Sequence, residues 1–122
     1  RGLAMGITFV TVTVTNPGYG KKSANRQFLV DSGAIYSVMP AKELKKLGIK
    51  VTSQEKFTLA DGQIIKRGLG NALFTFKDKV RAAPVIFGDE GIYLLGATTL
   101  EALGVFLDPI KRELRALPML LM

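Results

Sequence analysis

The chain has 122 residues, with 17 Lys and Arg against 10 Asp and Glu, and it contains neither cysteine nor histidine. This length suits one compact domain, residues 1–122, whose core is drawn from the 48% of residues that are apolar. The missing Cys and His exclude disulfides, zinc sites built on thiolate or imidazole, and Ser-His or Cys-His catalysis. Any acid–base chemistry must come from Asp, Glu, Lys or Tyr, and we expect neither a metal nor a cofactor.

The formal net charge of +7 raises the possibility of a nucleic-acid partner. The basic residues, however, fall in separate groups, each in an expected turn, on a helix face or beside a strand end. We interpret them as solvated surface and expect no nucleic-acid partner. A basic β-barrel that binds nucleic acid stays a third hypothesis, but Tyr and Phe are spread among apolar neighbours and form no stacking platform between basic residues.

The sequence contains no run of about 18 apolar residues, so we expect no membrane span. It shows no targeting signal, and a cytoplasmic location is the expectation.

The first third of the chain predicts a β-hairpin followed by a short helix. Alternating Val and Thr predict a strand over residues 6–15, and turn residues then lead to a second strand, residues 26–30, antiparallel to the first. A helix is expected over residues 40–47, with Pro40 as its first residue and Gly48 as its stop.

The middle third reads as strands joined by tight turns. Asp61-Gly62 between apolar runs is a strong hairpin signal, and Gly68-Leu69-Gly70 allows a bend or a close approach of two backbones. Pro84 places part of the last strand at an edge or a bulge. Strands are expected at residues 57–60, 64–65, 72–76 and 80–87.

The last third predicts a short strand over residues 92–96, a helix over residues 98–104 and a final hairpin. Thr98 or Thr99 is expected to cap this helix and Gly104 to stop it. The final strands are residues 105–107 and 114–117, on either side of an Asp108-Pro109 turn. Seven or eight strands with two short helices fit a β-rich barrel or sandwich.

One strand ends in an unexpected way, since the apolar run Phe28-Leu29-Val30 is followed directly by Asp31. A carboxylate at the edge of a core costs desolvation energy unless something pairs with it. Stability therefore does not explain Asp31, and we take it as the main candidate for a functional residue.

Val30-Asp31-Ser32-Gly33-Ala34 resembles the Asp-Thr/Ser-Gly-Ala signature of retroviral-type (retropepsin-like) aspartic proteases. A hairpin precedes it, a second hairpin follows about thirty residues later where that family carries its flap, and Leu94-Leu95-Gly96 resembles the second family signature. The resemblance covers residues 7–117 and is close in layout to the retroviral-like protease domain of DNA-damage-inducible proteins and to prokaryotic relatives. It implies an all-β acid-protease barrel with one or two short helices, working as a two-fold homodimer.

The resemblance also implies roles for individual residues. Asp31 would be catalytic, and Ser32, Gly33 and Ala34 would support the active-site loop: a hydroxyl tying two loops together, a backbone N–H approaching the carboxylate, and room for substrate. A peptide or protein substrate would bind in an extended conformation under a flap. The residues expected at the flap are Ala60, Asp61, Gly62 and Gln63, with an ordinary surface hairpin as the alternative. Five further residues are candidates either for apolar subsites or for the plain core: Ala34, Ile35, Leu59, Val85 and Ile86.

This chemistry needs two carboxylates that share one proton, and the chain carries one Asp-Ser-Gly. Asp61 and Asp108 both read as turn residues, so the second carboxylate must come from a second copy of the chain. We therefore expect an aspartic endopeptidase whose water lies between two Asp31 side chains, with the apolar tail, residues 118–122, covered in the dimer. The alternative is a catalytically silent protease-like domain kept for dimerisation or peptide binding.

Overall fold

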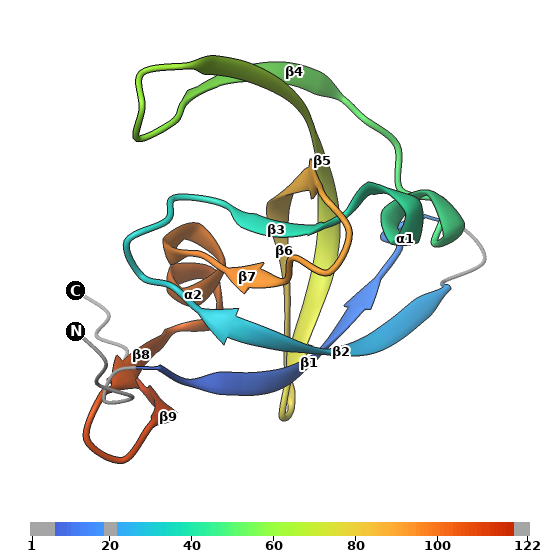
Figure 1. Cartoon of the computed structure of the whole chain (residues 1–122). Helices are drawn as coiled ribbons and strands as arrows, with labels where there is room; N and C mark the ends of the chain where they lie inside the picture. Colours follow the sequence, from blue (N-terminus) through green and yellow to red (C-terminus); the bar gives the residue numbers. More distant parts are fainter. Residues whose placement is uncertain (1–6, 19–21, 119–122) are drawn as a thin grey trace, which may run out of the picture.

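The structure, a computed structural model, describes residues 7–18 and 22–118 (Figure 1). The end of the first predicted turn, the start of the first predicted strand and most of the apolar tail lie outside the described residues. Within them the elements are β1 (Phe9–Thr15), β2 (Ser23–Val30), β3 (Ser37–Pro40), α1 (Ala41–Lys46), β4 (Ser53–Thr58), β5 (Ile64–Phe76), β6 (Lys79–Gly88), β7 (Leu94–Leu95), α2 (Ala97–Leu103), β8 (Val105–Asp108) and β9 (Glu113–Ala116).

Seven of these strands form one sheet in the order β1-β2-β7-β3-β6-β5-β4. Because β1 also pairs with β5, the sheet closes on itself, which confirms the predicted barrel. Two pairs in the sheet are parallel, β2 with β7 and β3 with β6, and these bring distant parts of the chain together. β8 and β9 form a separate two-stranded antiparallel sheet.

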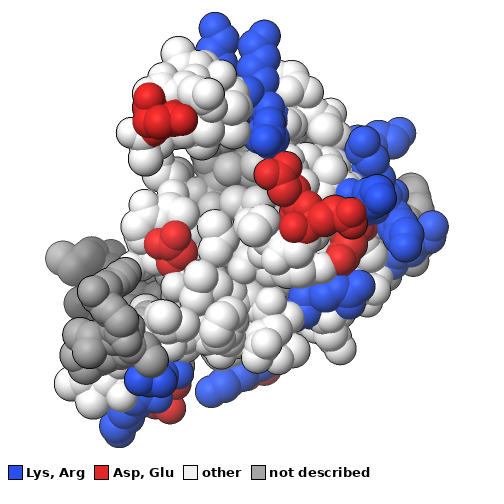
Figure 2. Space-filling view, in the orientation of Figure 1, with Lys and Arg blue, Asp and Glu red and all other residues white. Residues whose placement is uncertain are grey.

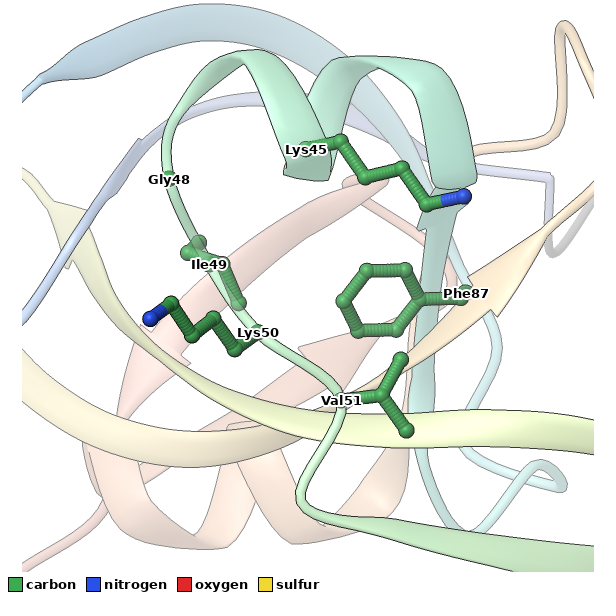
Figure 3. A pocket seen from close by; sticks show the side chains of 6 residues that line it. All are labelled: Lys45, Gly48, Ile49, Lys50, Val51 and Phe87. Carbon is green, nitrogen blue, oxygen red and sulfur yellow. The ribbon is translucent and has the colours of Figure 1, made fainter.

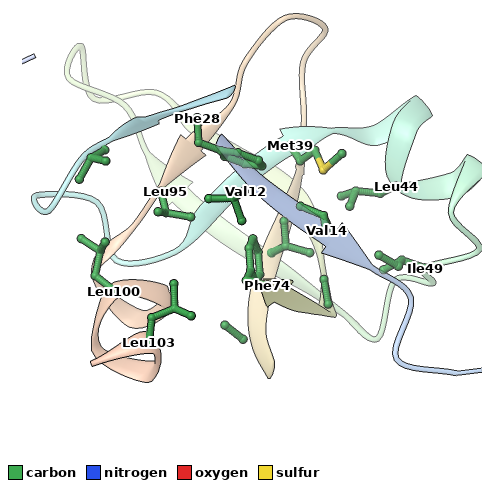
Figure 4. Packing of buried hydrophobic residues seen from close by; sticks show 14 of the residues in the cluster. Val12, Val14, Phe28, Met39, Leu44, Ile49, Phe74, Leu95, Leu100 and Leu103 are labelled. Carbon is green, nitrogen blue, oxygen red and sulfur yellow. The ribbon is translucent and has the colours of Figure 1, made fainter. Parts of the chain in front are cut away.

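The core joins inward-facing side chains of the barrel strands to apolar side chains of α1 and α2 (Figure 4). In β1 the alternation predicted from the sequence holds, since Val12 and Val14 are fully buried while Thr11 is exposed. Phe28 of β2 packs edge-to-face on Phe74 of β5, with 6.4 Å between ring centroids. The strand that leads to Asp31 is therefore anchored in the core by its own apolar side chains.

The helix α1 is held against the barrel by a polar cluster. Glu43 accepts a hydrogen bond from Arg26 Nε at 2.7 Å and another from the Tyr93 hydroxyl. Hydrogen bonding to Glu43 raises the pKa of Arg26. Burial is the main cause that raises the pKa of Tyr93, and its hydrogen bond to Glu43 raises that pKa further. The Tyr93 ring also packs edge-to-face on Phe28 at 5.6 Å, so the cluster links α1, β2 and the segment before β7.

Several predicted elements differ from the structure in detail. Residues 64–76 form one continuous strand, β5, and the predicted close approach of two backbones is found at Gly70, where a Cβ would lie 2.6 Å from Lys50 O. The predicted strand over residues 92–96 shrinks to β7, and residues 37–40 form a strand, β3, that the sequence did not predict. Pro40 ends β3 and is the N-cap residue of α1, one position before the helix.

The cap of α2 was also predicted wrongly. Its N-cap residue is Gly96, and no side chain caps the helix, so neither Thr98 nor Thr99 has that role. The predicted stop is confirmed, because Gly104 adopts a left-handed conformation with φ of 68°.

Charged side chains are spread over the surface in separate groups (Figure 2). In this view Lys and Arg gather over the β4–β5 hairpin, around α1 and near β8 and β9, with acidic side chains beside them. Among the described residues, no helix is long and apolar enough to cross a membrane.

The turn between β8 and β9 carries a pH-dependent contribution to stability. Backbone hydrogen bonds from Lys111 and then Ile110 lower the pKa of Asp108, and Arg115 lowers it further. Since the folded pKa lies below the usual value of 3.8, this contribution is present above that pH and is lost as pH falls through the folded pKa.

We therefore expect Asp108→Asn to unfold at a lower temperature than the wild type at neutral pH, with a gap that shrinks below about pH 4. Thermal unfolding followed by circular dichroism across this range measures the gap. Asp78→Asn, in the turn between β5 and β6, is the control, since the Asp78 carboxylate makes no hydrogen bond or ion pair within the described residues. A gap for Asp108→Asn that stays constant with pH would contradict the assignment.

Candidate active site

Asp31 stands on a tight turn between β2 and β3. Its backbone N–H donates to Leu95 O at 2.9 Å, and the N–H of Ala34 donates to Asp31 O at 3.1 Å. The carboxylate Oδ1 accepts the N–H of Gly33 at 3.1 Å, which is the approach expected of that glycine. Asp31 is half-buried and Ser32 is exposed, so the carboxylate lies at the surface directly after the buried end of β2.

The second signature, Leu94-Leu95-Gly96, lies directly against this turn. Leu94 pairs with Leu29 of β2, and Leu95 is fully buried. A Cβ on Gly96 would lie only 2.5 Å from the carbonyl oxygen of Tyr36, so no other residue fits there without moving the loop. The Asp-Ser-Gly turn and the second signature are thus in direct contact, and this contact was not predicted from the sequence.

The predicted flap residues form the tip of the β4–β5 hairpin, which extends over β3 in Figure 1. Asp61 Oδ1 accepts the N–H of Gln63 at 2.9 Å, and the N–H of Gly62 donates to Leu59 O at 2.9 Å. Gly62 has a φ of 89°, which favours glycine. Residues 60–63 are all exposed, so the Asp-Gly turn forms the hairpin tip as predicted.

An apolar pocket of about 300 Å³ lies under this hairpin, and we call it the hairpin pocket. Leu59 and Ile86, two of the expected subsite residues, line it, whereas Val85 is fully buried in the core and Ile35 is 68% exposed on the loop. Most of the lining residues were not predicted from the sequence. The alternation of side chains along the hairpin could have predicted part of this lining. Phe57 and Leu59 are two residues apart and so share a face, and Ile65 lies opposite Phe57 on the neighbouring strand. The full lining is Val38, Phe57, Leu59, Ile65, Arg67, Ile86, Gly88, Asp89 and Ile92.

A larger pocket of about 560 Å³ lies beside Ser32, and we call it the Ser32 pocket. It is mainly apolar, and two of its residues, Phe106 and Leu117, are also among the exposed large apolar residues. Its lining is Ser32, Ala97, Leu100, Glu101, Val105, Phe106, Leu107, Pro109 and Leu117. The loop with Asp31 therefore has an apolar surface next to it. In the described part of the chain, no group of three or more acidic residues is placed to hold a metal ion.

A third pocket, of about 320 Å³, lies where the chain passes from α1 to β4, and Asp31 is not among its lining residues (Figure 3). Ile49 and Phe87 form its apolar floor, and the Lys45 and Lys50 side chains lie at its sides. A Cβ on Gly70 would lie 2.6 Å from Lys50 O and 3.0 Å from the Phe87 ring. The glycines of β5 thus let residues 49–51 cross directly against the strand that carries the hairpin.

We expect Gly70→Ala to lower the free energy of unfolding by about 1–3 kcal/mol, because the added methyl meets backbone that cannot rotate away. Gly68→Ala is the matched variant, since the nearest atoms to its methyl belong to the exposed Val51 side chain, at 2.7 Å, and not to backbone. Urea unfolding of both variants measures the difference. Equal stability of the two would contradict this explanation of Gly70.

The barrel, the Asp-Ser-Gly turn and the hydrophobic-hydrophobic-glycine segment behind it define a retropepsin-like aspartic protease fold. Residues 10–99 match the family model described as aspartyl protease, and the chain therefore belongs to the aspartyl protease family.

Two solved structures show the same fold. A retropepsin-like aspartic protease from Rickettsia conorii is 23% identical, with a TM-score of 0.54 over 84% of this chain and 77% of that chain. The protease of Simian Foamy Virus (mac) is 14% identical, with a TM-score of 0.54 over 75% of this chain and 92% of that chain. The search of curated proteins gave no match.

Proposed function

We propose that this protein is an aspartic endopeptidase that works as a homodimer, with one catalytic Asp31 from each protomer. The observation that carries the proposal is the setting of this carboxylate. It is partly exposed directly after the buried Phe28 and Val30 at the end of β2, and its side chain accepts one hydrogen bond within the described residues, from Gly33. Such a carboxylate is free to meet a second one and a water molecule.

In the proposed reaction, one Asp31 is ionised and its counterpart in the partner is protonated. The ionised carboxylate takes a proton from the water as the water oxygen attacks the peptide carbonyl carbon, while the protonated one donates a hydrogen bond to the carbonyl oxygen. The tetrahedral intermediate then collapses, the C–N bond breaks, and the amine nitrogen takes the proton that the first Asp31 received from the water, which returns that carboxylate to its ionised form. Because the reaction needs one of the two carboxyl groups protonated, activity is expected to favour acidic pH.

The Ser32 pocket supports a second copy of this chain as the dimer partner. It is apolar, it borders the loop that carries Asp31, and Phe106 on its rim is 42% exposed. Exposed apolar surface of this kind marks interaction sites. A partner placed there brings its own Asp31 loop toward this one, which is what the chemistry requires. Ser32 would then supply the hydroxyl that ties the two loops together.

The β4–β5 hairpin is the proposed flap, with Ala60, Asp61, Gly62 and Gln63 at its tip. The hairpin pocket beneath it has an apolar lining that suits hydrophobic side chains of a substrate. An extended peptide would pair its main chain with the protein, and closure of the hairpin would exclude water. The expected substrates are therefore peptides with hydrophobic residues around the scissile bond.

Cleavage of quenched fluorescent peptides tests this proposal directly. The wild type is expected to cleave peptides with hydrophobic residues at the scissile bond, most rapidly at the acidic end of a series from about pH 3 to about pH 7, and pepstatin is expected to inhibit it. A dimeric, folded protein that cleaves nothing across this series would contradict the proposal and favour a catalytically silent binding domain.

A further inference from the structure

Two buried hydroxyl groups meet behind the loop that carries Asp31. Ser37 begins β3 and Thr99 lies in the first turn of α2, and both side chains have 0% exposure. Ser37 Oγ and Thr99 Oγ1 lie 2.6 Å apart, which is hydrogen-bond distance. Buried hydroxyls are costly unless they are paired, and Thr99 does not cap its helix. Valine has nearly the same shape as threonine and would fill the same space at position 99, so packing alone does not explain the hydroxyl.

Ser37 joins this pair to the second signature. Its Oγ also accepts the backbone N–H of Gly96 at 2.9 Å. Two further bonds hold the same two segments together, from Ala97 N–H to Ala34 O at 2.7 Å and from Thr98 N–H to Ile35 O at 2.9 Å. These two are backbone to backbone, so the bond through Ser37 is the one of the three that depends on a side chain.

The contact continues to Asp31 through two short steps. Gly96 is packed against the carbonyl of Tyr36, with no room for a Cβ. The residue before it, Leu95, accepts the backbone N–H of Asp31 at 2.9 Å. A shift of Gly96 would therefore move both the end of the loop and the acceptor that holds Asp31.

We infer that Ser37 and Thr99 are positioning residues. Their paired hydroxyls hold the Asp31 loop in the position that lets its carboxylate meet the carboxylate of the partner subunit. The inference rests on the proposed function. Two carboxylates that share a proton tolerate little displacement, and a misplacement of about 1 Å can cost about 100-fold in rate. A fully satisfied buried polar network supplies this rigidity, since it has one low-energy arrangement.

The test compares three variants of the full chain with the wild type and with Asp31→Asn. Thr99→Val removes the hydroxyl and keeps the shape, Thr99→Ser keeps the hydroxyl and removes a methyl, and Thr98→Val is the control on the same helix turn. Thr98 makes no side-chain hydrogen bond within the described residues. Peptide cleavage, sedimentation and thermal unfolding are measured for each, with kcat followed across pH.

Thr99→Val is expected to remain dimeric and to lose about 10- to 100-fold in kcat with little change in KM. In its profile of kcat against pH, the acidic and basic limbs are expected to lie closer together than in the wild type, because carboxylates that are farther apart interact less. Thr99→Ser is expected to keep a kcat within about 3-fold of the wild type even if its unfolding temperature falls, and Thr98→Val should match the wild type.

A Thr99→Val enzyme with wild-type kcat and pH profile would overturn the inference, whatever its stability. If Thr99→Val does not fold, Thr99→Ser decides: a folded dimer with a kcat as low as that expected of Thr99→Val would also overturn it. The wild type and Asp31→Asn keep the two proposals distinguishable. Cleavage by the wild type that Asp31→Asn abolishes supports the proposed function independently of either threonine.

Discussion

Asp31→Asn is expected to abolish peptide cleavage, with a fall in kcat of about 10²- to 10⁴-fold or to below detection. Asparagine has nearly the same shape, and its Oδ1 can still accept the Gly33 N–H that the carboxylate accepts at 3.1 Å. The change removes the general base from both protomers of the proposed dimer while leaving the turn intact. The measurement is peptide cleavage at acidic pH, with circular dichroism and sedimentation to show that the fold and dimer persist.

Asp78→Asn is the matched control, since it makes the same chemical change in the turn between β5 and β6. It is expected to retain wild-type activity. Cleavage by highly purified Asp31→Asn at the wild-type rate would sink the catalytic assignment.

Mixing the two proteins gives a sharper result. If subunits exchange freely, equal amounts of wild type and Asp31→Asn leave about one quarter of the dimers with both carboxylates. Cleavage per wild-type chain should then fall to about half, whereas sites that act independently would lose nothing.

Phe106→Asp is expected to have the second largest effect, because it places a charge on the proposed dimer face. Phe106 is 42% exposed on β8 and lines the Ser32 pocket, so the substitution leaves the barrel core untouched. Loss of an aromatic anchor from an interface typically costs about 2–4 kcal/mol, which raises the dimer dissociation constant by about 30- to 1000-fold. Activity at low enzyme concentration should fall by a similar factor and recover as the enzyme is concentrated.

Val80→Asp is the control for this variant. Val80 is 47% exposed at the start of β6 and is absent from the lining of the Ser32 pocket. It should leave the dimer and its activity unchanged. A Phe106→Asp protein that sediments as a dimer and cleaves normally would show that the partner does not bind on this face.

Local sequence chemistry predicted the parts of the fold that depend on neighbouring residues. The Asp-Gly tip of the β4–β5 hairpin, the left-handed stop at Gly104 and the inward Val12 and Val14 all follow from the preferences of single residues and short patterns. The Asp31 motif was visible for the same reason, since a carboxylate after an apolar run conflicts with core formation.

The parts that escaped prediction depend on contacts between distant segments. β3, the strand that was not predicted, is held by parallel pairing with β6, and such pairing leaves no periodic pattern in four residues. A strand was predicted around β7, but its parallel partner, β2, was not. Thr99 illustrates the same limit: its position near a helix start predicted a cap, but a partner 62 residues away takes its hydroxyl. Gly70 has its reason in Lys50 and Phe87, which only the packed barrel brings to it.

The most direct test of the account is a crystal structure of the wild-type protein bound to a peptide-like inhibitor. We expect a two-fold dimer in which the two Asp31 carboxylates lie nearly in one plane beneath the β4–β5 hairpins, with their oxygens within hydrogen-bond distance of each other. Two Asp31 carboxylates far apart in the dimer, or an inhibitor bound away from them, would contradict it.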